Sequence, residues 1–417
     1  MFKLAEENKN LLPAFAMCAS GLENVLFEEL AKTKGVQFLS KISGGVHFMA
    51  SPADIYRLNI WASIPSRILI KIGKTQINNS EELFEFALRI DYKQWFLDTN
   101  TFKVNVTSTG RMPKGLSANY AALKFKDGIC DYFRNKFKGR RPNVDTKNPD
   151  IIIFLHFKNS LLTVSIDTSG EPLFKRGWRE SKGIAPIREN LVCALLSFTK
   201  WDFSKSLIDP MCGSGTFIIE GVKRAAKLPA NYLPQKRRKF SCENFSPESP
   251  FSEVNCKIFI EEALNSWESK NHYLQDLPEI IGFDQDEDMI KYSELNASNA
   301  LPKNLANSIK WKVTNFSEKK FHNHGINPAG VLVTNPPFGL RIKLNENDKR
   351  IFFENFGNNL KKNFSGWTAW ILTEDKDLSS KIKLKPKNRY PVFNGDIACN
   401  WLSFNLFSGS LKNEQKN

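Results

Sequence analysis

The sequence has few of the residues that build metal centres and disulfide frameworks. Its seven cysteines are scattered, odd in number and without a Cys-x-x-Cys pair, and only five histidines occur among 417 residues. Such usage argues against a disulfide-stabilised secreted domain and against a zinc cluster. We therefore expect no bound metal.

Long apolar runs are also missing. No stretch approaches the roughly 18 consecutive apolar residues that a membrane-spanning helix requires. Residues 1–10 carry acidic side chains where a signal peptide would have an apolar core. These absences predict a cytoplasmic protein without a membrane partner.

Acidic residues are outnumbered by basic ones. Lys and Arg total 59 against 44 Asp and Glu, which leaves a net charge of +15 and a pI near 9.3. A surplus of this size favours a polyanionic partner, because basic side chains displace the counterions of a phosphate backbone. On charge alone, a generally basic surface without such a partner is the alternative.

The apolar patterns divide the chain into regions. Residues 14–60 and 67–167 read as two small α/β units, the first ending in a helix with Ser51 as its cap. From about residue 183, strand and helix patterns alternate, which predicts a parallel, doubly wound sheet. The stretch 229–252, rich in Pro, Ser and basic residues, reads as a long insertion or flexible loop.

The first strand of this alternating region ends in a glycine turn. Residues 206–220 read SLIDPMCGSGTFIIE, so that an apolar strand ends at Asp209 and Gly213-Ser214-Gly215 leads into a helix. Glycines let the backbone approach a ligand, and the free N–H groups of the helix start suit a carboxylate or hydroxyls. The turn lacks both the dinucleotide-binding pattern G-x-G-x-x-G and the P-loop GK[ST].

A second strand ends in acidic residues. Residues 280–289 read IIGFDQDEDM, which places Asp284 at a strand end where a carboxylate can bind ribose hydroxyls. The alternative is a helix cap, for which Asp286 is the better candidate because Glu287 opens a helical pattern.

A third strand ends in an amide followed by two prolines and an aromatic residue. Residues 331–340 read VLVTNPPFGL, with Asn335, Pro336, Pro337 and Phe338 after the strand. A rigid loop of this kind can accept hydrogen bonds from an –NH2 group and stack on the ring that carries it. A simple tight turn is the alternative for the tetrapeptide alone.

Together the three motifs resemble the cofactor, ribose and catalytic motifs of class I methyltransferases that modify exocyclic amines. The resemblance implies a Rossmann-like domain with a mixed seven-stranded sheet, S-adenosylmethionine as cofactor, and Asn335, Pro336, Pro337 and Phe338 as catalytic residues. It implies that the cofactor is bound by Asp209, Pro210, Cys212, Gly213, Ser214, Gly215, Thr216, Asp284, Gln285, Asn315, Phe316 and Asn335.

The upstream chain narrows the family. It resembles the THUMP region and linker of bacterial 23S rRNA guanine-N2 methyltransferases over residues 102–108, 121–133, 141–145, 165–179 and 185–191. The resemblance implies a ferredoxin-like N-terminal unit over residues 1–64, a THUMP RNA-binding domain over 65–168, a linker over 169–183 and the methyltransferase domain over 184–410.

Two departures from the family are visible. Asn315 stands where the family has an acidic residue for the adenine amino group of the cofactor. An Asn can still accept a hydrogen bond, so we expect weaker discrimination and not a loss of binding. Some family members carry a second methyltransferase domain; this chain ends at Asn417, so we expect a single activity.

The resemblance implies methylation of the exocyclic N2 amino group of a guanine in 23S rRNA, with the base flipped onto the Asn335 loop. The implied partner is 23S rRNA or a ribosome assembly intermediate. RNA contacts are expected from two basic segments, unless these are only solvated surface: Lys175, Arg176, Trp178 and Arg179, and Lys236, Arg237, Arg238 and Lys239. The alternatives are an N2-guanine or N6-adenine methyltransferase acting on tRNA or another RNA, and a non-catalytic RNA-binding assembly factor.

Overall fold

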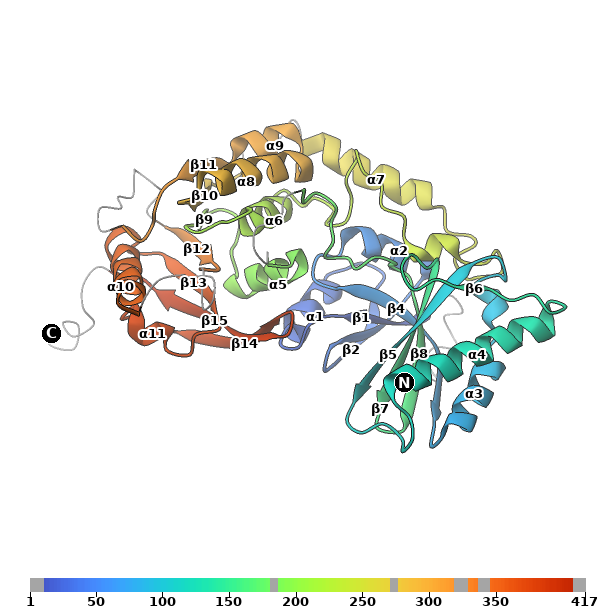
Figure 1. The fold of residues 1–417 in the computed structure, drawn as a ribbon. Coiled ribbons are helices and arrows are strands. Elements are labelled where there is room, and N and C mark those ends of the chain that lie inside the picture. The colour runs from blue at the N-terminus through green and yellow to red at the C-terminus, as the bar shows by residue number, and fades with distance from the viewer. Residues whose placement is uncertain (1–10, 181–186, 271–276, 319–328, 337–345, 408–417) are drawn as a thin grey trace. The chain divides into compact units, whose positions relative to one another are not determined.

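The computed structural model describes residues 11–180, 187–270, 277–318, 329–336 and 346–407 (Figure 1). The chain forms two compact units. Unit 1 comprises Met1–Cys18, Leu26–Leu173 and Arg237–Glu261, and unit 2 comprises Ala19–Val25, Phe174–Lys236 and Glu262–Asn417. Each unit is built around one sheet, described separately below.

Unit 1 begins with a ferredoxin-like arrangement of strands and helices. Its elements are β1 (Leu12–Met17), most of α1 (Glu23–Ala31), β2 (Gln37–Ile42), β3 (Gly45–Ala50), α2 (Pro52–Trp61) and β4 (Arg67–Gln76). The predicted cap of α2 is confirmed, since the Ser51 side chain accepts a hydrogen bond from the Asp54 N–H and Pro52 opens the helix.

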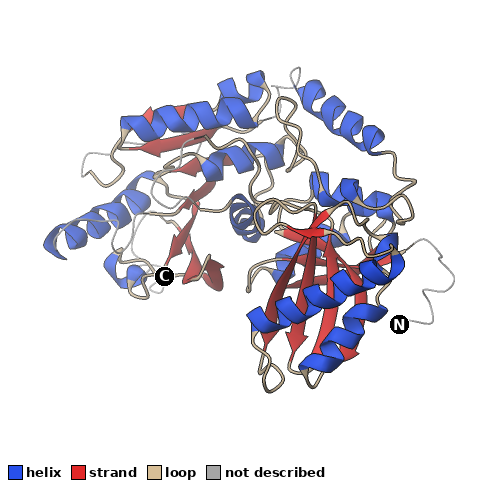
Figure 2. Ribbon diagram, turned by 45° about the vertical axis from the view of Figure 1, so that its right-hand side comes forward, coloured by secondary structure: helices blue, strands red, loops and turns tan. Residues whose placement is uncertain are grey.

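The same sheet continues into the second region of unit 1. Here the elements are α3 (Ser80–Arg89), β5 (Thr101–Thr109), α4 (Ala118–Lys136), β6 (Asn143–Val144), β7 (Ile151–Lys158) and β8 (Leu161–Asp167). The eight strands have the order β2-β3-β1-β4-β8-β7-β5-β6. Because β4 pairs with both β1 and β8, the two small units expected from the sequence share one sheet. Helices α3 and α4 lie across one face of it (Figure 2).

Unit 2 contains the predicted alternation of strands and helices. Its elements are α5 (Glu189–Thr199), β9 (Ser206–Asp209), α6 (Thr216–Ala225), most of α7 (Cys256–Ser269), β10 (Ile280–Asp284), α8 (Glu287–Ala300), α9 (Lys303–Ser308), β11 (Lys310–Val313), β12 (Gly330–Thr334), α10 (Glu346–Asn363), β13 (Thr368–Thr373), α11 (Leu378–Lys381), β14 (Asn388–Asn394) and β15 (Ile397–Asn405).

The seven strands of unit 2 have the order β11-β10-β9-β12-β13-β15-β14. The first five are parallel, and β15 is antiparallel to both β13 and β14. This confirms the predicted mixed seven-stranded sheet. All residues of β9 and β12 are buried, as in parallel sheets whose two faces are covered.

The chain reverses its direction of travel across this sheet at β9. From β9 it proceeds to β10 and β11 on one side, and then to β12 and β13 on the other. Ligands of open α/β sheets bind beyond the carboxyl ends of the strands at such a switch point. The topology therefore places the residues after β9 and β12 where a ligand site is expected.

The segment predicted as a long insertion or flexible loop, residues 229–252, lies entirely within the described part of the chain. It contains a short 3-10 helix, Ser241–Asn244, and Arg237–Glu261 belongs to unit 1. The helix α7 that follows was not predicted, and of its residues only Ala263 and Trp267 are buried. In the described part of the chain, no helix is both long and apolar enough to cross a membrane.

Candidate functional site

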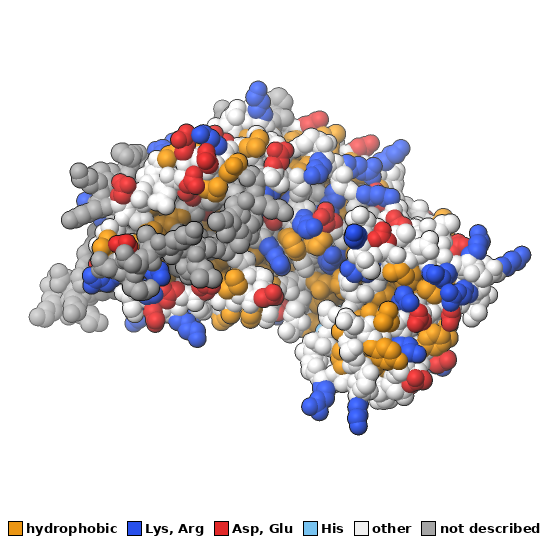
Figure 3. Space-filling model, in the orientation of Figure 1, with side chains coloured by type: hydrophobic (Ala, Val, Ile, Leu, Met, Phe, Trp, Pro, Cys, Tyr) orange, Lys and Arg blue, Asp and Glu red, His pale blue; other side chains and the backbone are white. Residues whose placement is uncertain are grey.

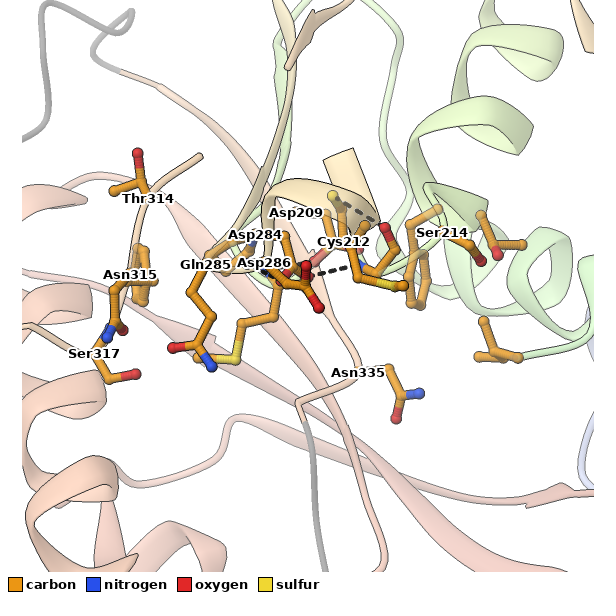
Figure 4. Close-up of a pocket in the computed structure, with 18 of the residues that line it drawn as sticks. Asp209, Cys212, Ser214, Asp284, Gln285, Asp286, Thr314, Asn315, Ser317 and Asn335 are labelled. Atoms are coloured by element: carbon orange, nitrogen blue, oxygen red, sulfur yellow. Dashed lines mark hydrogen bonds between the residues drawn. The ribbon is translucent and has the colours of Figure 1, made fainter. Parts of the chain in front are cut away.

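A cavity of about 370 Å³ opens beyond the carboxyl ends of β9, β10, β11 and β12 in unit 2 (Figure 4). This volume lies within the range of small-molecule sites. The lining residues that the sequence singled out are Asp209, Pro210, Cys212, Gly213, Ser214, Thr216, Asp284, Gln285, Asn315, Phe316 and Asn335. The three strand-end motifs thus meet at one cavity.

The glycine turn needs both of its glycines, for different reasons. Gly213 and Gly215 have φ angles of +53° and +82°, which side chains disfavour. A Cβ atom on Gly213 would meet no atom within 4 Å, so this position faces open space. A Cβ atom on Gly215 would lie 2.8 Å from the Trp311 ring and 3.1 Å from Ser293, so this position is needed for packing.

Asp284 and Asp286 have separate tasks. Asp284 Oδ2 accepts a hydrogen bond from the Gly213 N–H at 2.9 Å, which ties the end of β10 to the glycine turn. Asp286 caps α8, as predicted, by accepting from the Asp288 N–H at 2.9 Å. Partial burial raises the pKa of Asp284. Asp284 is therefore part of the cavity wall and is not the cap of α8.

Asp209 is the most deeply buried carboxyl group of the cavity. It is 1% exposed, and its Oδ1 accepts a hydrogen bond from the Met211 N–H at 3.1 Å. Burial raises the pKa of Asp209 to about 7, and the charge of Asp284 acts in the same direction. The acidic end of the cavity can therefore gain or lose a proton near neutral pH.

The loop after β11 forms another wall. The Asn315 Oδ1 atom accepts a hydrogen bond from the Ser317 N–H at 3.0 Å, which shapes the loop. Phe316 is buried in the core against Phe356 while also lining the cavity. The Asn359 amide on α10 donates to the Phe316 carbonyl at 2.6 Å. Sequence reasoning missed Asn359, whose only local signal is a polar residue on the buried face of a helix.

Asn335 follows β12 and is partly buried. Its side chain faces the same cavity as the acidic residues (Figure 4). Pro336 is buried but does not line the cavity. Pro337 and Phe338, predicted as catalytic residues, lie outside the described residues.

Helix α8 supports the glycine turn from behind. The Ser293 hydroxyl donates to the Gly213 carbonyl at 2.7 Å, and the Asn296 amide donates to the Ser214 carbonyl at 3.1 Å. Both side chains are fully buried. Neither residue was predicted, although buried polar groups three positions apart on a helix indicate a shared polar partner.

The structure corrects the first of the two predicted RNA-binding segments. Arg176 and Trp178 are 3% and 1% exposed, so neither presents a surface to RNA. Arg176 instead lies among buried polar groups, where it donates to Asn231 and faces Glu220. The Arg179 side chain is also largely enclosed, and only Lys175 is exposed. Arg176, Trp178 and Arg179 therefore have structural roles inside the protein, and the prediction that they contact RNA is wrong.

The second basic segment is at the surface. Lys236, Arg237 and Lys239 are exposed, while Arg238 lies over the Phe240 ring at 5.7 Å. Arg237 also forms an ion pair with Glu243 at 2.8 Å, which reduces the charge it presents. Figure 3 shows further Lys and Arg side chains at the surface.

Three family models match the chain. The model described as "RMKL-like, methyltransferase domain" matches residues 176–403, the THUMP domain model matches residues 78–167, and the RlmL ferredoxin-like domain model matches residues 14–69. The resemblance found in the sequence is thereby confirmed.

Individual relatives agree. "Putative RNA methyltransferase slr0064" from Synechocystis is 31% identical over 95% of this chain and 97% of its own length. "Ribosomal RNA large subunit methyltransferase K/L" from Colwellia psychrerythraea is 33% identical over 94% of this chain. The match covers 52% of that relative, so the chain spans about half its length. The crystal structure of SMU.472 complexed with SAH is 26% identical, with a TM-score of 0.79 over 96% of this chain and 100% of that chain.

The methyltransferase-domain match spans more than half of the 417 residues, and a relative above 30% identity is matched over nearly its full length. The chain therefore belongs to the RMKL-like methyltransferase family, in the form that also carries RlmL ferredoxin-like and THUMP domains.

Proposed function

We propose that this chain transfers a methyl group from S-adenosylmethionine to the exocyclic N2 amino group of a guanine in large-subunit ribosomal RNA. The observation that carries the proposal is that Asn335 faces the same cavity as the glycine turn and Asp284. The Asn335 amide, which can accept a hydrogen bond from an amino group, therefore lies beside a site suited to the cofactor. The name of the Colwellia relative supports ribosomal RNA as substrate, and the guanine N2 position rests on the sequence resemblance.

The cavity residues fit S-adenosylmethionine. Gly213 leaves room for a ligand beside the turn. Asp284 and Asp286 offer acceptors for ribose hydroxyls, and Asp209 can balance positive charge on the cofactor. Apolar lining suited to the adenine ring comes from Ile187, Met289 and Phe316. When bound, the cofactor supplies an electrophilic methyl group on its sulfonium.

The chain's own contribution is to hold the acceptor nitrogen. The Asn335 side-chain oxygen and the Pro336 carbonyl would accept hydrogen bonds from the two –NH2 protons, which orients the nitrogen lone pair towards the methyl group. Near-attack positioning of this kind is worth roughly 7–11 kcal/mol. No general base is required, because the proton can leave after the methyl group has been transferred.

The RNA must present an unpaired base. In the proposal, a paired guanine is flipped out of its helix and stacks on the Phe338 ring, which contributes about 1–3 kcal/mol. The THUMP domain and the surface segment Lys236–Lys239 are proposed to hold the surrounding RNA through its phosphates.

The test is single-turnover methyl transfer to a ribosomal RNA transcript with labelled cofactor. Asn335→Ala should lower the rate by orders of magnitude while RNA and cofactor still bind, because the lost acceptor matters most in the transition state. Asn315→Ala, which removes another asparagine of the same cavity, is the matched control and should raise the dissociation constant of the cofactor instead. Phe338→Tyr should be tolerated and Phe338→Ala should impair base capture.

The product identifies the base. Mass spectrometry of nucleosides from a deletion strain should show loss of N2-methylguanine from ribosomal RNA. Loss of N6-methyladenine, or loss confined to transfer RNA, would favour the other methyltransferase substrates. Near-normal turnover by Asn335→Ala would show that the loop is structural and would overturn the proposal.

A further inference from the structure

Arg179 makes a set of contacts that RNA binding does not explain. Its Nη1 atom donates to the Ser214 hydroxyl at 2.6 Å and its Nη2 atom donates to the Thr216 hydroxyl at 2.9 Å. These two side chains flank Gly215 and line the cavity. One guanidinium therefore holds both sides of the glycine turn.

A carboxylate fixes the orientation of this guanidinium. Glu189 Oε1, at the start of α5, accepts from Arg179 Nε at 3.1 Å and from Nη2 at 2.9 Å. Both side chains are only 9% exposed, so little water competes for these bonds. The planar fork of arginine can serve a carboxylate and two hydroxyls at once, which a lysine ammonium cannot do in the same geometry.

The segment that carries Arg179 is itself anchored to the same turn. The Glu180 N–H donates to the Asn296 Oδ1 at 3.3 Å, and the Asn296 amide donates to the Ser214 carbonyl at 3.1 Å. The Arg179 guanidinium lies over the neighbouring Trp178 ring at 4.7 Å, and Trp178 is buried. The turn is thus held through its backbone by Asn296 and through its side chains by Arg179.

We propose that Arg179 is a positioning residue for cofactor binding, which acts through Ser214 and Thr216 to hold the glycine turn in its ligand-ready form. This inference rests on the proposed function, because it assumes that the turn contacts S-adenosylmethionine. Pre-organisation lowers the ordering penalty of binding, so its loss weakens affinity without removing a ligand contact. Arg179 itself does not line the cavity.

The experiment is a double-mutant cycle on the full chain. The dissociation constant of S-adenosylmethionine is measured by calorimetry for the wild type, Arg179→Ala, a Ser214→Ala/Thr216→Val variant, and the combined variant. Arg179→Ala should raise the constant tenfold or more, and should have little further effect once both hydroxyls are gone. Glu189→Gln should have a smaller effect in the same direction. If the fold-change in the dissociation constant of the combined variant equals the product of the fold-changes of the Arg179→Ala and Ser214→Ala/Thr216→Val variants, the proposal is overturned.

Two further readouts separate positioning from general stability. Arg188→Ala is the matched control, because this exposed arginine contacts the Phe174 ring at 4.8 Å in the same region and is not bonded to the turn. It should leave the dissociation constant unchanged. Without cofactor, hydrogen exchange at residues 213–217 should accelerate in Arg179→Ala and Arg179→Lys but not in Arg188→Ala. Unchanged exchange there would overturn the proposal.

The same measurements distinguish this inference from the proposed function. If the wild type does not bind S-adenosylmethionine, the proposed function is refuted. The claim that Arg179 assists cofactor binding is then refuted as well, whatever the exchange data show. If the wild type binds S-adenosylmethionine and Arg179→Ala binds it with the same dissociation constant, only the inference about Arg179 is refuted.

Discussion

Replacing Asp209 by asparagine should change the pH dependence of stability. Burial is the main reason that the pKa of Asp209 is raised to about 7. The folded protein therefore holds this proton more tightly than the unfolded chain, in which the pKa is near the ordinary value of 3.8. The contribution of the protonated Asp209 carboxyl group to the free energy of unfolding is therefore fully present below about pH 4, and it is lost as the pH rises from there to about 7. Asparagine keeps the shape and an oxygen for the Met211 N–H but cannot ionise.

The magnitude follows from the difference between the two pKa values. At about 1.4 kcal/mol per pKa unit, ionisation of Asp209 lowers the free energy of unfolding by about 4 kcal/mol above pH 7. About 2 kcal/mol of this falls between pH 5.5 and pH 8.5. For a domain of the size of unit 2, that is roughly 4–8 °C in melting temperature.

Calorimetry without cofactor tests the prediction. The melting temperature of Asp209→Asn relative to the wild type should rise between pH 5.5 and pH 8.5 by the amount given above. Because S-adenosylmethionine is cationic at its sulfonium, its binding near pH 7 should also release a proton from the wild type but not from Asp209→Asn. Titrations in buffers of different ionisation enthalpy measure this release. A pH-independent difference between the two proteins would refute the argument from burial.

Three further outcomes are expected. Asp284→Ala should weaken S-adenosylmethionine binding by roughly 1.5–3 kcal/mol, with RNA affinity unchanged, and an unaltered dissociation constant would contradict a role in ribose binding. Gly213→Ala should fold normally but bind the cofactor weakly, because its methyl group meets no protein atom. Gly215→Ala should lower the melting temperature, because its methyl group would clash with the Trp311 ring. Equal melting temperatures and equal cofactor affinities of the two variants would contradict this difference in packing. RNA affinity should fall steeply as the salt concentration rises, and charge reversal across Lys236–Lys239 should make this dependence on salt weaker. An RNA affinity that does not depend on salt would contradict phosphate contacts by this basic segment.

Much of unit 2 could be predicted from local sequence. The strand β9 ends at Asp209 and the helix α8 begins at Glu287, as the sequence predicted, and Asp286 caps α8 as expected. Short strands with an apolar centre and capped helices are specified by residues that lie close together in the sequence. Helix α7 was not predicted, although Ile260, Ala263, Leu264 and Trp267 recur along it at helical spacing.

By itself, the sequence determined the three strand-end motifs, because each is a local pattern of an apolar strand followed by residues suited to a ligand. Only the tertiary structure decided the tasks of the charged side chains between them. Arg176 and Arg179 read as a surface for RNA, yet their partners Asn231 and Ser214 lie 55 and 35 residues away along the chain. Whether a cation is solvated or buried against a distant acceptor depends on which segments the fold brings together, and no local pattern records that.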